Sequence, residues 1–196
     1  MTGPRRLRVQ AHAPTARASA LVFGDTGSLV RPPTQDPPVG SREQRLALCG
    51  PEPACAQSAT GAGWAVQVSD QLRGPDCGHW TGRTLAEIAA ADPAGLAGWL
   101  ADPDARPHGG ETLTKLIGRL TTLLRLPDQT PVQADADGDE APQLWLATPL
   151  VVRALVVAAL GAPPVVLFAV DVSFGGEVLL SGSGRRWRLQ GLTRNS

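Results

Sequence analysis

The chain has little of several residue types on which common protein classes depend. Its 196 residues contain no Tyr, one Met and three Cys. An odd and sparse cysteine count is typical of a reducing compartment and argues against a disulfide-rich secreted scaffold. Cys49, Cys55 and Cys77 also lack the spacing of metal ligands, so we expect free, partly buried thiols.

Histidine is scarce too, which bears on metal binding. The three histidines are His12, His79 and His108, and they have no metal-ligand spacing. We therefore expect neither a metal nor another cofactor, with a three-histidine metal site as a minor alternative. The acidic segment 135–140 faintly resembles a calcium loop, but Gly138 comes too early for that motif, and a solvated loop is the better interpretation.

The chain carries no excess charge and no long uninterrupted apolar run. Its 18 basic and 18 acidic side chains cancel, which argues against a nucleic-acid or lipid surface. The longest apolar run, 154–170, is interrupted by Gly161, Pro163 and Pro164, so it does not predict a membrane span. The basic N-terminal segment is not followed by the apolar stretch of a signal peptide. We expect a cytoplasmic protein.

What the chain does have is the composition of one globular α/β domain over residues 1–196. Hydrophobic residues make up 42% of it and charged residues 18%. We expect strands over 6–11, 46–49, 64–68, 143–148 and 165–170. We expect helices over 52–60, 84–92, 93–100, 111–126 and 149–160. A terminal hairpin is expected from 177–180 and 186–190. This alternation predicts a mostly parallel sheet with helices on both faces.

Two segments end strands in a way that predicts a site. Ligands of parallel sheets bind beyond the carboxyl ends of the strands. His12 follows the first expected strand, and Thr148 follows the expected strand 143–148. Thr148 before Pro149 is also a favoured helix N-cap, and the backbone N–H groups of such a helix end can bind an anion. We expect His12 and Thr148 to be neighbours in space.

Three motifs resemble those of one protein family. Residues 78–84, GHWTGRT, resemble a Gly-x-Trp-Glu-Gly-x-Thr turn, and residues 108–112, HGGET, resemble Gly-Gly-Glu-Ser. Residues 149–155, PLVVRAL, resemble the start of the last catalytic helix of the same family. The family is the histidine phosphatase superfamily, which includes the phosphoglycerate mutases and α-ribazole phosphatases. The resemblance implies a three-layer αβα sandwich of the histidine-phosphatase type with a mostly parallel central sheet.

The resemblance also assigns roles at the first strand. It implies that His12 matches the histidine that attacks phosphorus, and that Thr15 matches a small hydroxyl residue that follows it. The family's arginine before this histidine is Ala11 here. The alternative interpretation of a lone histidine after a strand is a structural role.

Several other family positions carry different residues here. The resemblance places Ala54 at the phosphate-binding arginine, Gly74 at the general acid and Thr148 at the second catalytic histidine. Guanidinium groups are the preferred clamp for a phosphoryl group. An arginine that stabilises a transferring phosphoryl group is worth about 10³–10⁵ in rate, and a general acid adds about 10²–10⁴. We therefore expect little phosphatase activity.

Other residues are candidates for replacing the missing groups. Asp76 is the nearby carboxylate that could act as the acid, although such a residue more often binds backbone amides of a turn. His108 could assist catalysis, and His79 could bind a ligand, because the family places their segments around its active site. Arg17 and Arg153 could replace the arginines, with solvated surface as the alternative role for each.

These observations predict a degenerate histidine phosphatase that binds a small, anionic ligand or a partner protein in the old pocket. One alternative is a repurposed enzyme of specialised metabolism that uses His12 as an acid or base on a bulkier, less charged substrate. Another alternative is a weak phosphomonoesterase acting through phosphorylated His12. Neither nucleic acid nor a membrane is an expected partner, and a homodimer is left open.

Overall fold

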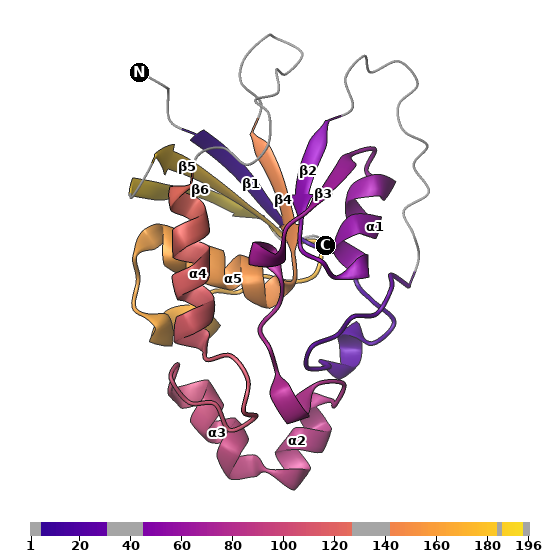
Figure 1. Cartoon of the computed structure of the whole chain (residues 1–196), viewed down its shortest axis with the longest axis vertical. Helices are drawn as coiled ribbons and strands as arrows, with labels where there is room; N and C mark the ends of the chain where they lie inside the picture. The colour runs from indigo at the N-terminus through magenta and orange to yellow at the C-terminus, as the bar shows by residue number, and fades with distance from the viewer. Residues whose placement is uncertain (1–4, 31–44, 127–141, 184–185, 194–196) are drawn as a thin grey trace.

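The computed structural model describes residues 5–30, 45–126, 142–183 and 186–193 (Figure 1). The acidic segment 135–140 lies outside the described residues. Within the described part, the elements follow the α/β alternation that the sequence predicts.

A six-stranded sheet forms the centre of the molecule, in the order β3-β2-β4-β1-β5-β6. The strands are β1 (Arg5–Ala11), β2 (Leu46–Cys49), β3 (Ala65–Val68), β4 (Gln143–Ala147), β5 (Glu177–Ser183) and β6 (Arg186–Thr193). The first four run parallel to one another, whereas β5 and β6 form an antiparallel hairpin on β1. The mostly parallel sheet and the terminal hairpin are therefore confirmed.

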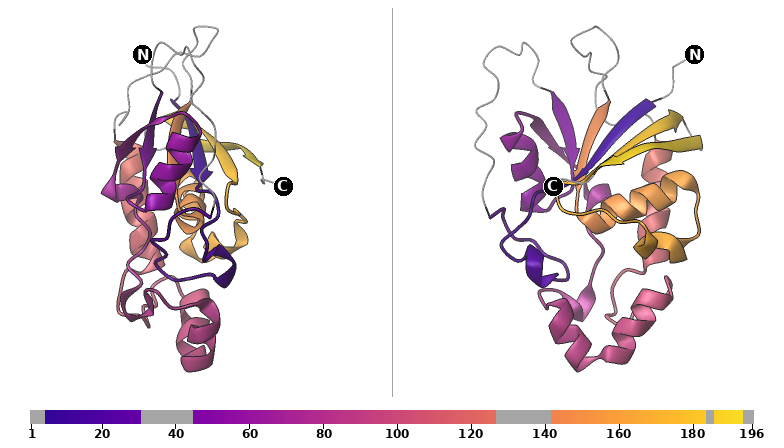
Figure 2. Two further views of the ribbon diagram at one scale, coloured as in Figure 1. Left: turned by 90° about the vertical axis from the view of Figure 1, so that its right-hand side faces the viewer. Right: turned by 180° about the vertical axis from the view of Figure 1, so that it is seen from behind.

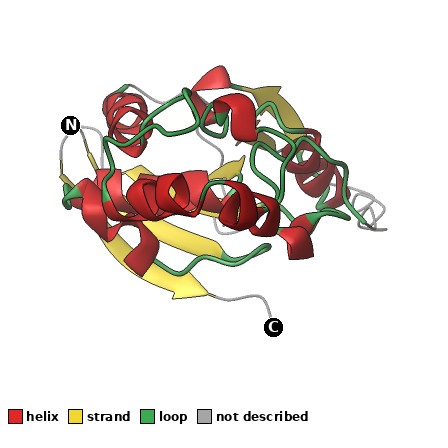
Figure 3. Cartoon of the chain, turned by 90° about the horizontal axis from the view of Figure 1, so that it is seen from below, coloured by secondary structure: helices red, strands yellow, loops and turns green. Residues whose placement is uncertain are grey.

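Helices cover both faces of this sheet (Figure 3). They are α1 (Pro53–Gly61), α2 (Leu85–Ala91), α3 (Pro93–Ala101), α4 (Leu113–Arg125) and α5 (Pro149–Leu160). Successive side chains of the central strands point to opposite faces of the sheet. Leu48 and Trp145 join the large core beneath α4 and α5, whereas Ala47 and Leu146 pack against α1. The result is the three-layer αβα sandwich that the family resemblance implies.

Local sequence signals set the ends of several helices. Thr84 caps α2 in a capping box with Glu87, and Asp92 both ends α2 and caps α3 ahead of Pro93. The stripe expected over 111–126 is the buried face of α4: its buried residues are Leu113, Leu116, Ile117, Leu120, Leu123 and Leu124. None of the helices in the described ranges is long and apolar enough to cross a membrane.

The prediction of a strand over 165–170 was wrong. Pro164–Ala169 forms a 3-10 helix, η4, in which Val166 N–H donates to the Pro163 carbonyl. A short apolar run does not distinguish a buried strand from a helical turn by its pattern. The place beside β1 that this segment would need is taken by the antiparallel strand β5. The two prolines at 163 and 164 favour the turn because their φ angles are already fixed near helical values.

The pair α2 and α3 lies beyond the carboxyl ends of the parallel strands (Figures 1 and 2). An aromatic cluster joins this pair to the rest of the core. The ring of Trp80 lies 5.1 Å from Phe23 and 6.2 Å from Trp99, and Trp99 lies 5.1 Å from Phe168 of η4. These contacts pack α3 against η4 beyond the strand ends.

Candidate functional site

The register of the sheet brings together the two strand ends that the sequence singles out. Ala11 of β1 pairs with Ala147 of β4, and His12 N–H donates to the Ala147 carbonyl at 3.0 Å. His12 and Thr148 are therefore neighbours, as predicted. Thr148 is the N-cap of α5, where its hydroxyl oxygen accepts from Val151 N–H at 3.4 Å.

His12 is held in one orientation by the backbone of the next residue. Its Nδ1 lies 2.7 Å from the carbonyl oxygen of Ala13. A carbonyl only accepts, so Nδ1 carries the hydrogen, and in a neutral ring Nε2 is then the basic nitrogen. The Ala13 N–H donates to Ser58 Oγ of α1 at 2.9 Å, which fixes this loop. The tautomer of His12 is therefore set by local geometry.

His12 is neutral over a wider pH range than an exposed histidine. The residue is only 4% exposed, and its ring packs at 5.3 Å from that of Phe174. Burial lowers the pKa of His12 below its usual value, although the Ala13 carbonyl and the Glu52 and Asp25 carboxylates act in the opposite direction. A neutral imidazole with a free Nε2 is suited to accept a proton or a hydrogen bond.

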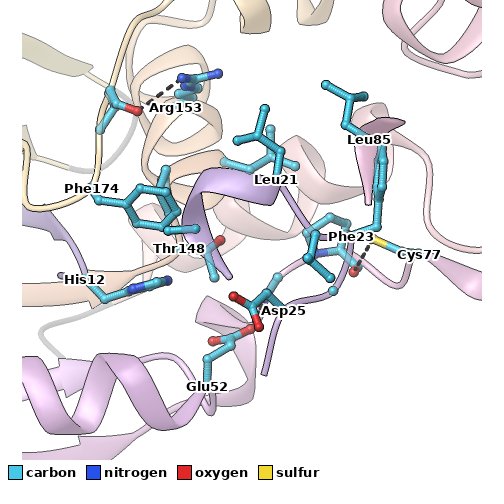
Figure 4. A pocket seen from close by; sticks show the side chains of 18 of the residues that line it. His12, Leu21, Phe23, Asp25, Glu52, Cys77, Leu85, Thr148, Arg153 and Phe174 are labelled. Atoms are coloured by element: carbon cyan, nitrogen blue, oxygen red, sulfur yellow. Dashed lines mark hydrogen bonds between the residues drawn. The ribbon is translucent and has the colours of Figure 1, made fainter. Parts of the chain in front are cut away.

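A cavity of about 770 Å³ opens in front of His12 (Figure 4). Most of its wall is apolar, and its large side chains include Leu21, Phe23, Leu85, Trp99, Leu100 and Phe168. Leu21 and Leu100 are 56% and 48% exposed, so they lie at the mouth, whereas His12 lies deep inside. The cavity has the size and lining of a site for a ligand with a bulky apolar part.

Leu21 at the mouth adopts an unusual backbone conformation. Its φ of 49° lies in the left-handed region, which costs energy for a residue with a Cβ. The Leu21 carbonyl accepts from Leu85 N–H at 3.1 Å, and Phe23 N–H donates to the Arg83 carbonyl at 2.9 Å. The segment around Leu21 is therefore pinned to the start of α2, and this contact builds one lip of the cavity.

Carboxylates, rather than guanidinium groups, flank His12 in the cavity. Asp25 and Glu52 both line it, and both carboxylates act electrostatically on the His12 ring. Figure 4 shows the two carboxylates and the imidazole pointing toward the same part of the cavity. Asp25 is fixed by Thr15, whose hydroxyl donates to its Oδ2 at 2.6 Å, and by Gly27 N–H, which donates to Oδ1 at 2.9 Å.

The Glu52 carboxylate lies beside Gly74 and Thr148, two positions at which the family resemblance places catalytic residues. Its Oε1 accepts from Gly74 N–H at 2.6 Å. A methyl group built on Gly74 would lie 3.2 Å from that oxygen and 4.0 Å from Thr148 Oγ1. Gly74 and Thr148 therefore lie together around the Glu52 carboxylate.

A partly buried ion pair holds the loop that carries Gly74. Arg119 of α4 makes a bidentate contact with Glu111, with Nε to Oε1 at 2.9 Å. The same guanidinium donates to the carbonyls of Gln71 and Arg73, each at 2.6 Å. The loop at 71–74 is thus held in place by Arg119, a residue far from it in the sequence.

Besides His12, four of the predicted site residues lie in or directly behind the cavity. Thr148, Asp76 and Arg153 line it, and Thr15 holds Asp25. Asp76 Oδ1 accepts from Gly78 N–H at 2.8 Å, which is the turn-binding role left open by the sequence. Arg153 donates to the Val172 carbonyl at 3.1 Å and lies 3.7 Å from an Asp171 carboxylate oxygen.

Three other predicted residues lie outside the cavity lining. His108 is buried against Trp80, and its Nδ1 accepts from Gly110 N–H at 2.9 Å. His79 is exposed beside it. Arg17 is exposed, and its guanidinium donates to the Gly82 carbonyl at 2.8 Å. The structure brings neither His79 nor His108 to His12.

Sequence reasoning missed Asp25 and Glu52. Glu52 stands directly before Pro53 at the start of α1. This position, between a strand and a helix, could have marked Glu52 as a candidate site residue. Asp25 gave no such signal, because it lies in a loop rich in glycine and polar residues. Only the bridge between Val22 and Thr84 and the bond from Thr15 bring it to the cavity.

Metal and thiol chemistry find little support at this site. No group of three His, Cys, Asp or Glu side chains within the described ranges is arranged to hold a metal ion. Cys77 lines the cavity, but burial raises its pKa to about 11, so it is a neutral thiol at neutral pH. Cys49 and Cys55 are buried and free, as expected from the sequence.

A family comparison identifies the protein class. Residues 48–195 match the model of the histidine phosphatase superfamily, branch 1. The chain belongs to this superfamily. The match begins after His12, so the histidine that the resemblance singles out lies outside the matched residues. The membership therefore rests on the region from β2 to the end of the sheet.

Similar proteins agree with this membership. Over 102 residues the chain is 30% identical to a glucosyl-3-phosphoglycerate phosphatase of Mycolicibacterium vanbaalenii. The aligned part covers 52% of this chain and only 45% of that relative. Among solved structures, mycobacterial hydrolase 1 is 25% identical, with a TM-score of 0.79 over 99% of this chain and all of that one.

More distant structures share the fold alone. The structure of mycobacterial glucosyl-3-phosphoglycerate phosphatase in complex with VO3 is 23% identical, with a TM-score of 0.75 over 97% of this chain and 100% of that one. The α-ribazole phosphatase from Shigella flexneri is 16% identical, with a TM-score of 0.70 and 95% of each chain covered. Histidine-phosphatase architecture is therefore common to all of them.

Proposed function

We propose that this histidine phosphatase superfamily member has little phosphomonoesterase activity and uses His12 as a general base or acid on a bulky, largely apolar substrate. One observation carries the proposal: the carboxylates of Asp25 and Glu52 flank His12 in the cavity. A transferring phosphoryl group carries negative charge, and two further negative charges beside it oppose its binding.

The arginines that line the cavity do not offset these carboxylates. Arg73 is exposed and donates to the Asp70 carbonyl, and Arg153 is held by the Val172 carbonyl beside Asp171. Neither lies within ion-pair distance of Asp25 or Glu52. These contacts argue against the small anionic ligand that the sequence first suggests, and they favour the larger, less charged substrate.

The state of His12 supports acid–base chemistry. Burial keeps the ring neutral to lower pH than usual, and the Ala13 carbonyl orients it with Nε2 as the basic nitrogen. A base in this state can accept a proton from a bound substrate and return it later in the reaction. The apolar cavity wall excludes water and supplies the binding surface for a bulky group.

A second candidate is a weak phosphomonoesterase that forms phosphorylated His12. The orientation of His12 favours it, because a nitrogen that attacks phosphorus must be free and face the cavity. The relatives compared above, which carry phosphatase names, favour it as well. Under this candidate the substrate phosphate has to be bound without an arginine in ion-pair contact.

Hydrolysis of p-nitrophenyl phosphate and a panel of sugar phosphates separates the two candidates. We expect wild type and His12→Ala to give the same rate, close to the background, from mildly acidic to neutral pH. His79→Ala is the matched control, because that histidine is exposed and outside the cavity. A rate that disappears in His12→Ala and persists in His79→Ala would establish the phosphatase and overturn the proposal.

The acid–base role itself is tested in cells that express the chain. Small-molecule profiles are compared by mass spectrometry between cells with wild type, His12→Asn and His79→Asn. We expect one product to disappear, and its precursor to accumulate, with His12→Asn alone. Unchanged profiles with His12→Asn would mean that this residue does no chemistry.

A further inference from the structure

The carboxylates of Asp25 and Glu52 have no cationic partner within the described residues. Asp25 receives hydrogen bonds from the Thr15 hydroxyl and Gly27 N–H. Glu52 receives one from Gly74 N–H, and the Cys55 thiol lies 3.9 Å from its other oxygen. These donors are neutral, so both negative charges remain uncompensated at the edge of a cavity with a mostly apolar wall.

A third acceptor faces the same space. His12 is 4% exposed and lines the cavity, and its Nδ1 is occupied by the Ala13 carbonyl. Within the described part of the chain, Nε2 has no hydrogen-bond partner. Figure 4 shows the ring directed toward Asp25 and Glu52. Nε2 is reached from the cavity, so an N–H group of a ligand there can donate a hydrogen bond to it.

The three groups share one chemical character. Each is a hydrogen-bond acceptor, and two carry negative charge. A phosphate, a carboxylate or a neutral ether would leave these acceptors unsatisfied. A protonated amine has three N–H donors and a positive charge, so it matches all three groups at once.

We infer that the ligand of this cavity carries a protonated amine, which binds between Asp25, Glu52 and Nε2 of His12, on an apolar body that contacts the aromatic wall. This inference rests on the proposed function and names the substrate class of the same site. Phe174 lines the cavity with its ring 5.3 Å from that of His12, and aromatic faces favour an alkylammonium. The apolar body then lies toward Leu21 and Leu100 at the mouth.

The first test compares three probes of matched shape by calorimetric titration of the full chain. They are phenethylamine, phenethyl alcohol and phenyl phosphate. We expect the amine to bind at least about tenfold more tightly than the alcohol, because charge-assisted hydrogen bonds replace neutral ones, and the phosphate to bind most weakly. High salt should reduce the preference for the amine. Equal or weaker binding of the amine, including no measurable binding, overturns the inference.

The second test assigns the preference to the two carboxylates. Glu52→Gln keeps an oxygen that accepts from Gly74 N–H. Asp25→Asn keeps an oxygen for Gly27 N–H, and its amide NH2 can donate to Thr15 Oγ1, which donates to Asp25 in the wild type. We expect each to lower amine affinity about tenfold and to leave alcohol affinity unchanged. Asp104→Asn is the matched control, an exposed carboxylate outside the cavity lining. A loss of amine affinity in the control and not in the site variants contradicts the assignment.

The outcomes distinguish this inference from the function it rests on. If amine and alcohol bind equally and no His12-dependent phosphatase activity is found, the amine class is wrong while the apolar-substrate proposal stands. If phenyl phosphate binds most tightly and its hydrolysis requires His12, both are wrong. Because the wild-type comparison needs no variant, a variant that fails to fold does not remove the test.

Discussion

The carboxylate of Glu52 accepts a hydrogen bond of 2.6 Å from the backbone N–H of Gly74. Gly74 stands at the position where the family resemblance places a general acid, and a side chain there would meet Glu52 first. The carboxylate beside His12 therefore comes from the start of α1 instead of the loop at Gly74. This arrangement keeps an acidic group near the histidine.

Replacing Glu52 should change the protonation of His12 in a defined direction. The negative charge of Glu52 favours the imidazolium form and so raises the pKa of His12 against the larger lowering by burial. Glu52→Gln should therefore lower the His12 pKa further. Titration of the His12 ring signals by NMR measures this, with Asp104→Asn as the control. An unchanged or raised pKa in Glu52→Gln would show that the two groups do not interact.

Arg119 should contribute far more to stability than an ordinary surface arginine. Its side chain and that of Glu111 are 17% and 11% exposed, and it also holds the loop at 71–74. Arg119→Ala leaves the mostly covered Glu111 carboxylate without its partner. Breaking a fully buried pair costs about 3–5 kcal/mol, and because this pair is partly exposed we expect a loss of about 1–3 kcal/mol. Denaturant unfolding measures the loss.

Arg8→Ala is the matched control for Arg119→Ala. Arg8 pairs with Glu177 at 2.6 Å, but the two side chains are 43% and 26% exposed. Exposed pairs contribute about 0–1 kcal/mol because solvent screens them. Similar losses for the two variants would mean that the loop at 71–74 does not depend on Arg119.

The stability of the protein should fall as the pH drops below the usual pKa of histidine. Burial lowers the pKa of His108 in the folded state, so at acidic pH the unfolded chain binds more protons. The contribution of neutral His108 is present above about pH 6.5 and is lost as the pH falls from there toward the lowered folded value. His12 acts in the same direction.

The variant His108→Asn isolates this effect. The Asn oxygen can accept from Gly110 N–H in place of Nδ1, and it does not titrate. Melting temperatures should then depend less steeply on pH in the acidic range than those of wild type. The exposed His79, replaced by Asn, is the control. A steeper dependence in His108→Asn than in wild type would contradict the sign.

Leu21 should tolerate glycine better than alanine. Its φ of 49° costs a residue with a Cβ about 1–2 kcal/mol, which glycine does not pay, although glycine loses about 0.4–1 kcal/mol through the unfolded chain. Leu21→Gly should thus be more stable than Leu21→Ala, by up to about 1.6 kcal/mol. Both should weaken binding of phenethyl alcohol, because the apolar mouth is lost. Thermal unfolding and titration measure the two effects.

Much of the secondary structure could be predicted because its signals are local. Thr84, Asp92 and Thr148 cap their helices with their own side chains, and the apolar spacing of α4 follows from helical geometry. The segment 165–170 could not be predicted, because its six apolar residues fit either a strand or a turn. What decided it was the pairing of β5 with β1, which lies outside the segment itself.

By itself, the sequence determined the α/β class, the ends of most helices and the meeting of His12 with Thr148. Those features depend on side chains close in the chain and on the rule that parallel strands end at one edge. Only the tertiary structure decided that Asp25 and Glu52 flank His12 and that His79 and His108 do not. The reason is physical: the charges around a buried side chain come from loops whose positions are set by long-range packing and hydrogen bonds, which no local pattern records.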